Sequence, residues 1–281
     1  MTFSFFQRSK VFVVCVLASA LCVFTGADLQ LAEAKSSASS VSARAAIFSN
    51  STKGERYYGK NVHMKVSPAS TTKVMTALLV LEKLSLDKVV TVSSHATSPQ
   101  PTKLHLRAGE KFRVRDLLYA VLLKSANDAS VVLAEAVAGS EWEFVQMMNK
   151  RAKQLGAKNT RFQNSHGLPS KGEQYTTAYD MYLIFRAALK HPFFRSAIKQ
   201  KSRTIKSLGG RTFALRSHNK ILFFDWKQKI YGKTGYTRSA QSCFVGYFMK
   251  GKDVCIIAVF GCSRRWEDIK HIVSRYGGVA L

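Results

Sequence analysis

A serine and a lysine three residues apart could form a nucleophile and its activating base. Ser70 and Lys73 lie in a segment that begins at Pro68, and a strongly apolar run, residues 74–84, follows them directly. Such a run predicts a buried helix, and Pro68 fits the start of one. Residues three apart on a helix are neighbours on one face, so the Lys73 amine is expected beside the Ser70 hydroxyl. This is the arrangement that an activated serine nucleophile needs.

Two more motifs give this pair a specific context. The Ser-x-x-Lys spacing alone is weak evidence, because it also occurs at three other serines of the chain. Ser125-Ala126-Asn127, however, falls at the predicted junction of two helices, where side chains can face a cleft, and Lys233-Thr234-Gly235 occurs once, on a strand-like run. The three motifs in this order resemble the S-x-x-K, S-D-N and K-T-G set of penicillin-binding proteins and β-lactamases, with Ala in place of Asp in the middle motif.

Neighbouring segments narrow the resemblance. Residues 164–169 (Asn-Ser-His-Gly-Leu-Pro), 177–180 (Thr-Ala-Tyr-Asp) and 232–237 (Gly-Lys-Thr-Gly-Tyr-Thr) are similar to the low-molecular-mass D-alanyl-D-alanine carboxypeptidases, and the resemblance covers about residues 43–278. Gln241 stands where these enzymes usually have Gly, which predicts a different turn after the Lys-Thr-Gly strand. The chain also stops before the β-rich second domain and the amphipathic membrane helix that many of these enzymes carry.

The resemblance implies a fold and a reaction. The implied fold is α+β, similar to that of β-lactamases and penicillin-binding proteins, with an antiparallel sheet flanked by helices and an all-helical subdomain. The implied reaction removes the terminal D-alanine from peptidoglycan stem peptides through an acyl-enzyme on Ser70, which β-lactams also acylate. No cofactor is expected.

The resemblance also implies roles for individual residues. Lys73 accepts the Ser70 proton as a neutral amine, because burial and the nearby cation Lys233 lower its pKa. The backbone N–H groups of Ser70 and Tyr236 form the oxyanion hole. The implied catalytic residues are Ser70, Lys73 and Ser125, and Ser125 relays a proton to the leaving amine. The implied substrate-binding residues are Asn127, which binds the peptide amide, and Lys233, Thr234 and Arg265, which bind the terminal carboxylate. Gly235 and Tyr236 are also implied to bind the substrate.

Other functions are weighed against this one. A D,D-endopeptidase of the same fold would cut peptidoglycan cross-links instead. A basic, non-catalytic protein that binds nucleic acid or an anionic envelope polymer is supported only by the net charge, and no nucleic acid is expected because the chain lacks an interleaved basic and aromatic motif. No Glu-x-x-Leu-Asn segment lies between the second and third motifs, which argues against an efficient class A β-lactamase.

Two polar residues near these motifs are interpreted as structural. His166 is expected to shape its loop, because a Ser/Lys pair needs no histidine as a base. Glu143 is the last residue of Ser140-Glu141-Trp142-Glu143, which is a capping box at the start of a helix. Its carboxylate is therefore interpreted as a helix-capping group.

The order of the predicted elements positions the motifs. A hairpin around Lys53-Gly54 comes first, helices fill the middle, and strands with a closing helix end the chain, which is an α+β order whose first and last elements can share one sheet. The ranges are strands 43–48, 57–61 and 89–92; a loop, 93–112; helices 115–123, 128–138, 140–155 and 177–189; strands 203–205, 211–215, 230–233, 243–249 and 254–261; and a helix, 265–276.

The N-terminus has the order of a secretory signal. Arg8 and Lys10 precede an apolar run, residues 11–24, and Ala32-Glu33-Ala34 offers a cleavage site. We expect residues 1–34 to be a signal that is cleaved or kept as an anchor, 35–42 a linker, and 43–281 the penicillin-binding D,D-peptidase domain. The protein is therefore expected in the periplasm or on the outer face of the cytoplasmic membrane.

The charge is unusual for a globular chain. Forty-three Lys and Arg residues against 17 Asp and Glu give a net charge of +26. Such a field favours anionic surfaces, and an anionic membrane or wall polymer is the expected contact. Among the cysteines, Cys15 and Cys22 lie in the signal, whereas Cys243, Cys255 and Cys262 lie in apolar runs and are expected to be buried. Without a clustered Cys and His set, no metal site is expected.

Overall fold

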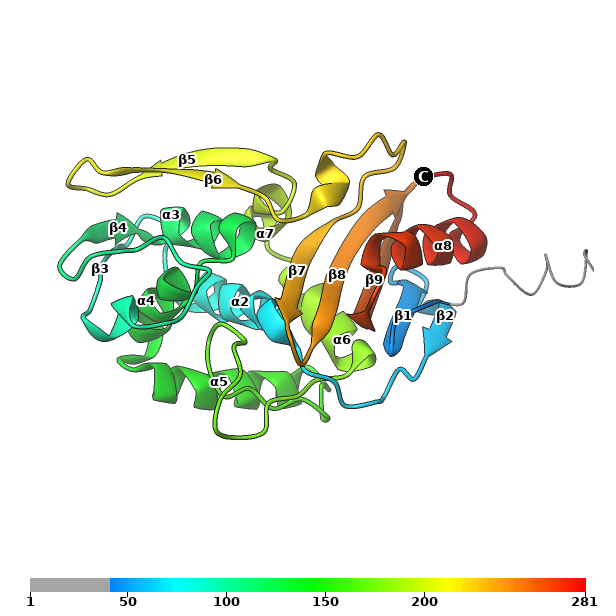
Figure 1. Ribbon diagram of the computed structural model, residues 1–281, viewed down its shortest axis with the longest axis horizontal. Helices are drawn as coiled ribbons and strands as arrows, with labels where there is room; N and C mark the ends of the chain where they lie inside the picture. Colours follow the sequence, from blue (N-terminus) through cyan, green and yellow to red (C-terminus); the bar gives the residue numbers. More distant parts are fainter. Residues whose placement is uncertain (1–40) are drawn as a thin grey trace, which may run out of the picture. The chain divides into compact units, whose positions relative to one another are not determined.

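A five-stranded antiparallel sheet joins the two ends of the part of the chain that the computed structural model describes, residues 41–281 (Figure 1). The strand order is β2-β1-β9-β8-β7, so the first hairpin pairs with the last strand. This confirms the expected α+β class, in which the first and last elements share one sheet. The strands are β1 (Ala45–Asn50), β2 (Glu55–Lys60), β7 (Tyr231–Thr237), β8 (Gln241–Lys250) and β9 (Asp253–Cys262).

Both faces of the sheet are covered by helices. Alternate residues of β9 belong to two different apolar clusters, as the period of two of a strand requires. Cys255, Ile257 and Val259 pack in the cluster that contains α8 (Arg265–Gly277), whereas Ile256 and Ala258 pack in the cluster that contains α6 (Ala178–Ala188). Burial on both sides explains why β9 is a continuous apolar run in the sequence.

A group of helices beside the sheet forms the expected helical subdomain (Figure 1). Its central helix, α2, is buried from Lys73 to Val80. The Ser140 half of the capping box is present, because the Ser140 side chain accepts a hydrogen bond from the Glu143 backbone N–H at 3.1 Å. The elements are η1 (Ala69–Thr72), α2 (Lys73–Lys83), α3 (Val114–Tyr119), the π-helical turn η3 (Ala120–Lys124), α4 (Asn127–Ala138) and α5 (Glu141–Gln154).

Some short elements differ from the expectation. Residues 93–112 were expected to be a loop, but they contain η2 (His95–Thr97) and the start of β4 (Lys111–Arg113), which pairs with β3 (Val89–Thr91). Three residues are too few to show a period in the sequence. The helix that was expected to stop at His191-Pro192 does end before them, at Ala188. Pro192 then begins a short helix that was not expected, α7 (Pro192–Ala197), because proline is also favoured in a first helical turn. The remaining elements are β5 (Ser202–Lys206), β6 (Thr212–Arg216) and η4 (Lys220–Leu222).

The turn between β7 and β8 accommodates the unusual Gln241. This residue begins β8 with a φ of 56°, in the left-handed region that glycine adopts without a steric penalty. Its side-chain Nε2 donates a hydrogen bond to the Arg238 carbonyl at 3.0 Å. The glutamine therefore keeps a glycine-like backbone conformation, and its side-chain hydrogen bond across the turn offsets the steric cost of that conformation.

The described chain begins two residues before the expected domain boundary. Val41 packs in the α8 cluster, and the Ser42 hydroxyl donates a 2.6 Å hydrogen bond to the Asp268 carboxylate. The expected signal, residues 1–34, and linker residues 35–40 lie outside the described residues. Between residues 41 and 281, no helix combines the length and the apolar character that crossing a membrane requires.

Asp268 fastens the start of the described chain to its last helix, so its replacement should destabilise the fold. Its buried carboxylate accepts from both the backbone N–H and the hydroxyl of Ser42, at 2.7 and 2.6 Å. We expect Asp268→Ala to lower the free energy of unfolding by about 1–3 kcal/mol, measured by urea denaturation. The exposed neighbour Glu267→Ala is the control, and equal urea midpoints for the two variants would contradict the role of Asp268.

Candidate active site

One pocket of about 300 Å³ collects most of the predicted site residues. It lies where η1, the end of η3 and strand β7 meet. The lining residues are Ser70, Thr102, Ser125, His218, Thr234, Gly235, Tyr236 and Arg265. The other three predicted residues, Lys73, Asn127 and Lys233, are buried and bonded to one another or to lining residues. All nine predicted residues therefore come together, although they span about 200 positions of the sequence.

Ser70 sits in a short 3-10 turn rather than in the helix proper. The turn η1 covers Ala69–Thr72, and Lys73 is the first residue of α2. Ala69 has a φ of 45°, which is unusual for a residue with a side chain. The Ser70 hydroxyl lies 3.1 Å from the Lys73 amine, so the expected side-by-side placement of the two groups is present.

The surroundings of Lys73 favour a neutral amine. Its Nζ donates to the Asn127 Oδ1 and to the His166 carbonyl, each at 2.7 Å. A neutral amine has two N–H groups and one lone pair, so with both N–H groups used the lone pair can face the Ser70 hydroxyl. Complete burial, followed by the charge of Lys233, lowers the pKa of Lys73 well below its usual value. The arrangement can therefore accept a proton from Ser70.

Ser125 and Lys233 form a second hydroxyl–amine pair on the opposite wall. The Lys233 Nζ donates to the Ser125 Oγ and to the Thr234 carbonyl, each at 2.9 Å. Burial, followed by the charge of Arg265, lowers the pKa of Lys233 to about 7. Ser125 has a left-handed φ of 62° at the end of η3, which ends the helical run just before α4 begins at Asn127. The pair can hold a proton at the Ser125 oxygen.

Asn127 and Arg265 are held by backbone carbonyls. The Asn127 Nδ2 donates to the Gln100 carbonyl at 2.7 Å while its Oδ1 accepts from Lys73. The Arg265 Nη1 donates to the carbonyls of Gly235 and Cys243 at 3.1 and 2.9 Å. Arg265 thus spans the ends of β7 and β8 and lines the pocket beside Thr234. Tyr236 is 65% exposed and also lines the pocket.

The close approach of β7 to η1 favours glycine at position 235. A Cβ atom on Gly235 would lie 3.1 Å from both the Ala69 Cβ and the Ser70 nitrogen. Gly167 approaches η1 from the other side, where a Cβ atom would lie 1.9 Å from the Ala69 carbonyl oxygen. The turn that carries Ser70 is therefore packed between two glycines, which fixes its backbone.

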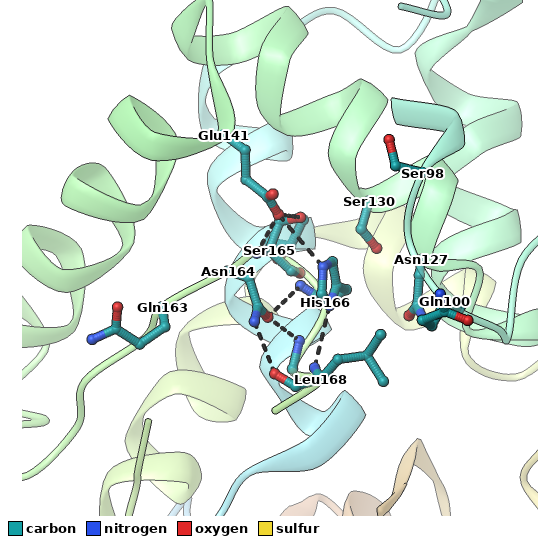
Figure 2. A network of polar contacts seen from close by, with 12 residues as sticks. Ser98, Gln100, Asn127, Ser130, Glu141, Gln163, Asn164, Ser165, His166 and Leu168 are labelled. Carbon is teal, nitrogen blue, oxygen red and sulfur yellow. Dashed lines mark hydrogen bonds and ion pairs between the residues drawn. The ribbon is translucent and has the colours of Figure 1, made fainter. Parts of the chain in front are cut away.

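The loop behind Lys73 is held by a polar network that includes Glu141 (Figure 2). The Glu141 Oε1 accepts from the Ser165 backbone N–H at 2.9 Å and from the Ser165 hydroxyl at 2.6 Å. The His166 Nδ1 accepts from the Leu168 N–H at 3.2 Å. Burial and the charge of Lys73 lower the pKa of His166 to about 3, so its ring is neutral. His166 therefore shapes the loop, as expected, and its carbonyl positions Lys73.

Comparisons with known proteins agree with this geometry. Residues 32–264 match the family described as D-alanyl-D-alanine carboxypeptidase. The chain belongs to this family. It is similar to the D-alanyl-D-alanine carboxypeptidase DacF of Bacillus subtilis, with 36% identity over 79% of this chain and 58% of that relative. It is also similar to a D-alanyl-D-alanine carboxypeptidase of Mycobacterium tuberculosis, with 32% identity over 73% of this chain and 70% of that relative.

Solved structures show the same fold. A mutant of a Streptomyces DD-transpeptidase has a TM-score of 0.79 and 28% identity, covering 85% of this chain and 99% of that one. A D-alanyl-D-alanine carboxypeptidase from Mycobacterium tuberculosis has a TM-score of 0.79 and 29% identity, covering 85% and 92%. The chain spans about 58% of the length of DacF. The comparison therefore covers only the matched part of that relative.

Three site residues of this carboxypeptidase family member are not indicated by its sequence motifs. They are Thr102 and His218, which line the pocket, and Glu141, which supports the loop behind Lys73. Only Glu141 had a local signal, as an acidic residue in the first turn of α5, and that signal suggests a helix terminus rather than a link to another loop. His218 follows β6 and comes near the site only through the tertiary fold.

Three cysteines lie in the described part of the chain. Cys243, Cys255 and Cys262 are buried free thiols, as expected from their apolar runs. Burial raises the pKa of Cys243 to about 11, which keeps this thiol protonated. Cys15 and Cys22 fall outside the described residues. In residues 41–281, His, Cys, Asp and Glu side chains form no group of three or more that could hold a metal ion.

Proposed function

We propose that this protein is a serine-type D-alanyl-D-alanine carboxypeptidase that removes the terminal D-alanine from peptidoglycan stem peptides. The observation that carries the proposal is the placement of the Ser70 hydroxyl 3.1 Å from a buried lysine whose two other contacts are both acceptors. Such a lysine acts as a base without a histidine or a metal ion. Membership of the carboxypeptidase family supports the choice of substrate.

Acylation begins at Ser70. Its Oγ attacks the carbonyl carbon between the two terminal D-alanines while the neutral Lys73 amine takes the hydroxyl proton. The developing negative charge on the carbonyl oxygen would be bound by the backbone N–H groups of Ser70 and Tyr236. A β-lactam, which presents a similar carbonyl next to a carboxylate, would acylate the same serine.

The leaving D-alanine departs on the side of Ser125. Ser125 would pass a proton to the nitrogen of the breaking C–N bond, and Lys233 would stabilise the Ser125 oxygen meanwhile. Thr234 and Arg265 would bind the carboxylate of the terminal D-alanine, because a hydroxyl donor and a guanidinium line this end of the pocket. Lys233 would assist from beside them, through its contacts with Ser125 and Thr234. Asn127 would hold the peptide amide, and Gly235 would let the strand pass close to Ser70.

The test of this assignment is the mass of the protein after incubation with penicillin. We expect one adduct of the drug's mass on the wild type, none on Ser70→Ala, and a loss of at least about 10³-fold in D-alanine release by that variant. Ser196→Ala is the matched control, because exposed Ser196 also precedes a lysine by three residues. A folded wild-type protein without an adduct would contradict the proposal and favour the non-catalytic binding protein.

The pH dependence of acylation tests Lys73 as the base. The rate should rise with pH through the pKa of Lys73, because the neutral amine is the reacting form. The negative charge of Glu141 raises that pKa against the larger lowering effects of burial and Lys233. Glu141→Gln removes this charge, so the acid limb of the rate profile should move to lower pH, measured with a fluorescent penicillin. The exposed control Glu143→Gln should leave the acid limb in place. The same shift in both variants, or a shift to higher pH in Glu141→Gln, would refute the assignment of Lys73 as the base.

We also place this enzyme outside the cytoplasm, in the periplasm or on the outer face of the cytoplasmic membrane. The signal-like N-terminus supports export, and the substrate class lies there. The net charge of +26 would hold the protein against an anionic membrane or wall polymer.

A vesicle assay tests this contact. We expect the protein to sediment with vesicles of anionic phospholipid at low salt and to be released as salt is added, because salt screens the attraction. Vesicles of zwitterionic phospholipid are the control. If the protein stays in solution with anionic vesicles at low salt, the membrane is excluded as its anionic partner.

A further inference from the structure

A second pocket is formed partly by the network behind Lys73. Its volume is about 540 Å³, which lies within the range of about 300–1,000 Å³ that small-ligand pockets have. Its walls come from η2, the last turn of α4, the start of α5 and the segment around Gln163. Glu141, which holds Ser165 in the loop behind Lys73, also lines this pocket. We call this site the α5 pocket.

An exposed tryptophan forms part of the α5 pocket. Trp142 is 67% exposed, which is the largest fraction among the exposed large apolar residues of positions 41–281. It is the second residue of α5 and lies inside the capping box, where capping requires no aromatic side chain. An indole ring is a flat apolar platform with a polar N–H group at its edge. An indole left exposed beside a cavity therefore suits a ligand that has one flat apolar face.

The polar groups around the indole are carboxylates and amides. None of the nine lining residues is Lys or Arg, although the chain has 43 Lys and Arg against 17 Asp and Glu. The lining contains the carboxylates of Glu135 and Glu141 and the amides of Gln146 and Gln163. His95 pairs with Glu135 at 2.8 Å, so even a protonated ring leaves the Glu141 charge unopposed within the lining. Because like charges repel, the α5 pocket disfavours carboxylates and fits a neutral polar ligand.

Several of these polar groups keep an atom for a ligand. Both hydrogen bonds that Glu141 accepts reach its Oε1, so its Oε2 can accept another. The Gln163 Nε2 donates to the Glu173 carbonyl at 3.2 Å, which leaves the Gln163 Oε1 as an acceptor. Figure 2 shows the Gln163 side chain directed away from the hydrogen-bonded loop beside it. Exposed Gln146 offers both N–H donors and an oxygen acceptor. The pocket can therefore bind several hydroxyl and amide groups at once.

One loop, residues 95–102, contributes to both the α5 pocket and the active-site pocket. His95 lines the first pocket and Thr102 lines the second. Seven residue steps span at most about 25 Å, and the 3-10 turn η2 shortens this distance. An extended stem peptide of about five residues spans about 17 Å. A stem peptide together with the sugar that carries it is therefore on the length scale of this separation.

We propose that the α5 pocket binds the N-acetylated sugar units of a peptidoglycan glycan strand. Such a sugar ring is neutral, has an apolar face of C–H groups that can pack on the Trp142 indole, and carries hydroxyl and acetamido groups that donate and accept hydrogen bonds. The choice of this sugar rests on the proposed function, because stem peptides are attached to such sugars. Binding in the α5 pocket holds the enzyme on the glycan while Ser70 acts on the stem peptides.

The first measurement is calorimetric binding of the N-acetylglucosamine tetramer, a neutral probe, to the full chain. We expect saturable binding that weakens about tenfold or more in Trp142→Ala and about threefold or more in Gln146→Ala. The matched controls are Tyr276→Ala, at a 40% exposed aromatic residue of α8, and Gln154→Ala, at an exposed glutamine at the end of α5. Both controls should keep the wild-type affinity.

The second measurement compares D-alanine release from two substrates. One is intact, insoluble peptidoglycan, and the other is a soluble pentapeptide without sugar that ends in D-Ala-D-Ala. The glycan contact acts only on the first substrate, so the ratio of the two rates should fall about threefold or more in Trp142→Ala. Tyr276→Ala should keep the wild-type ratio.

Each other outcome overturns the inference. A wild type that forms the penicillin adduct but does not bind the tetramer has no glycan site, although the carboxypeptidase proposal survives. An affinity that is unchanged in Trp142→Ala, or that falls equally in Tyr276→Ala, shows that the sugar does not bind in the α5 pocket. Binding of tetralysine in place of the sugar assigns the pocket to cationic ligands, and an unchanged ratio of rates contradicts its role on the glycan. A wild type with neither penicillin adduct nor sugar binding overturns both proposals, and the missing adduct distinguishes this case.

Discussion

The burial of two lysine amines without a carboxylate partner is the constraint on which the site depends. Lys73 and Lys233 are 0% and 1% exposed, and their hydrogen-bond partners are hydroxyl, amide and carbonyl oxygens. Keeping a charged ammonium in such surroundings costs several kcal/mol, so the neutral form gains. Burial and the neighbouring cations therefore lower the pKa of both amines, to about 7 for Lys233, while the hydrogen-bond acceptors hold each amine in a fixed position.

The rigidity of the surroundings follows from the same constraint. The neutral Lys73 amine directs its lone pair at the Ser70 hydroxyl only while the Asn127 and His166 oxygens hold its two N–H groups in place. Asn127 is fixed through Gln100, and the loop of His166 is fixed by Glu141 through Ser165. Gly167 and Gly235 allow the loop and the strand β7 to press on the turn of Ser70 from two sides. Ser70 and Lys73 are thus positioned by backbone contacts together with the buried side chain of Asn127.

Much of this arrangement could be predicted from local sequence. The apolar run after Lys73 indicated a buried helix, the capping box indicated the start of α5, and the pairing of the first and last strands followed from the element order. Seven of the nine site residues could be named because they belong to the three motifs, whereas Tyr236, which follows the third motif, and Arg265 were named only from the resemblance. Glu141, Thr102 and His218 could not be found in this way, because their proximity to the site arises from contacts between distant segments. Short elements such as β4 and α7 were also not predicted, because so few residues show no measurable period of hydrophobicity.

The pairing of β1 with β9 has a consequence for how the site assembles. A strand near position 45 and one near position 258 must meet across more than 200 residues, and closing so long a loop is a slow and entropically costly step. Strand β7, which carries Lys233, reaches its place beside Ser70 as part of the sheet that this closure completes. The chain thus keeps Ser70 and Lys233 apart until its last strands have joined the sheet. The pocket that they share is complete only in the folded protein.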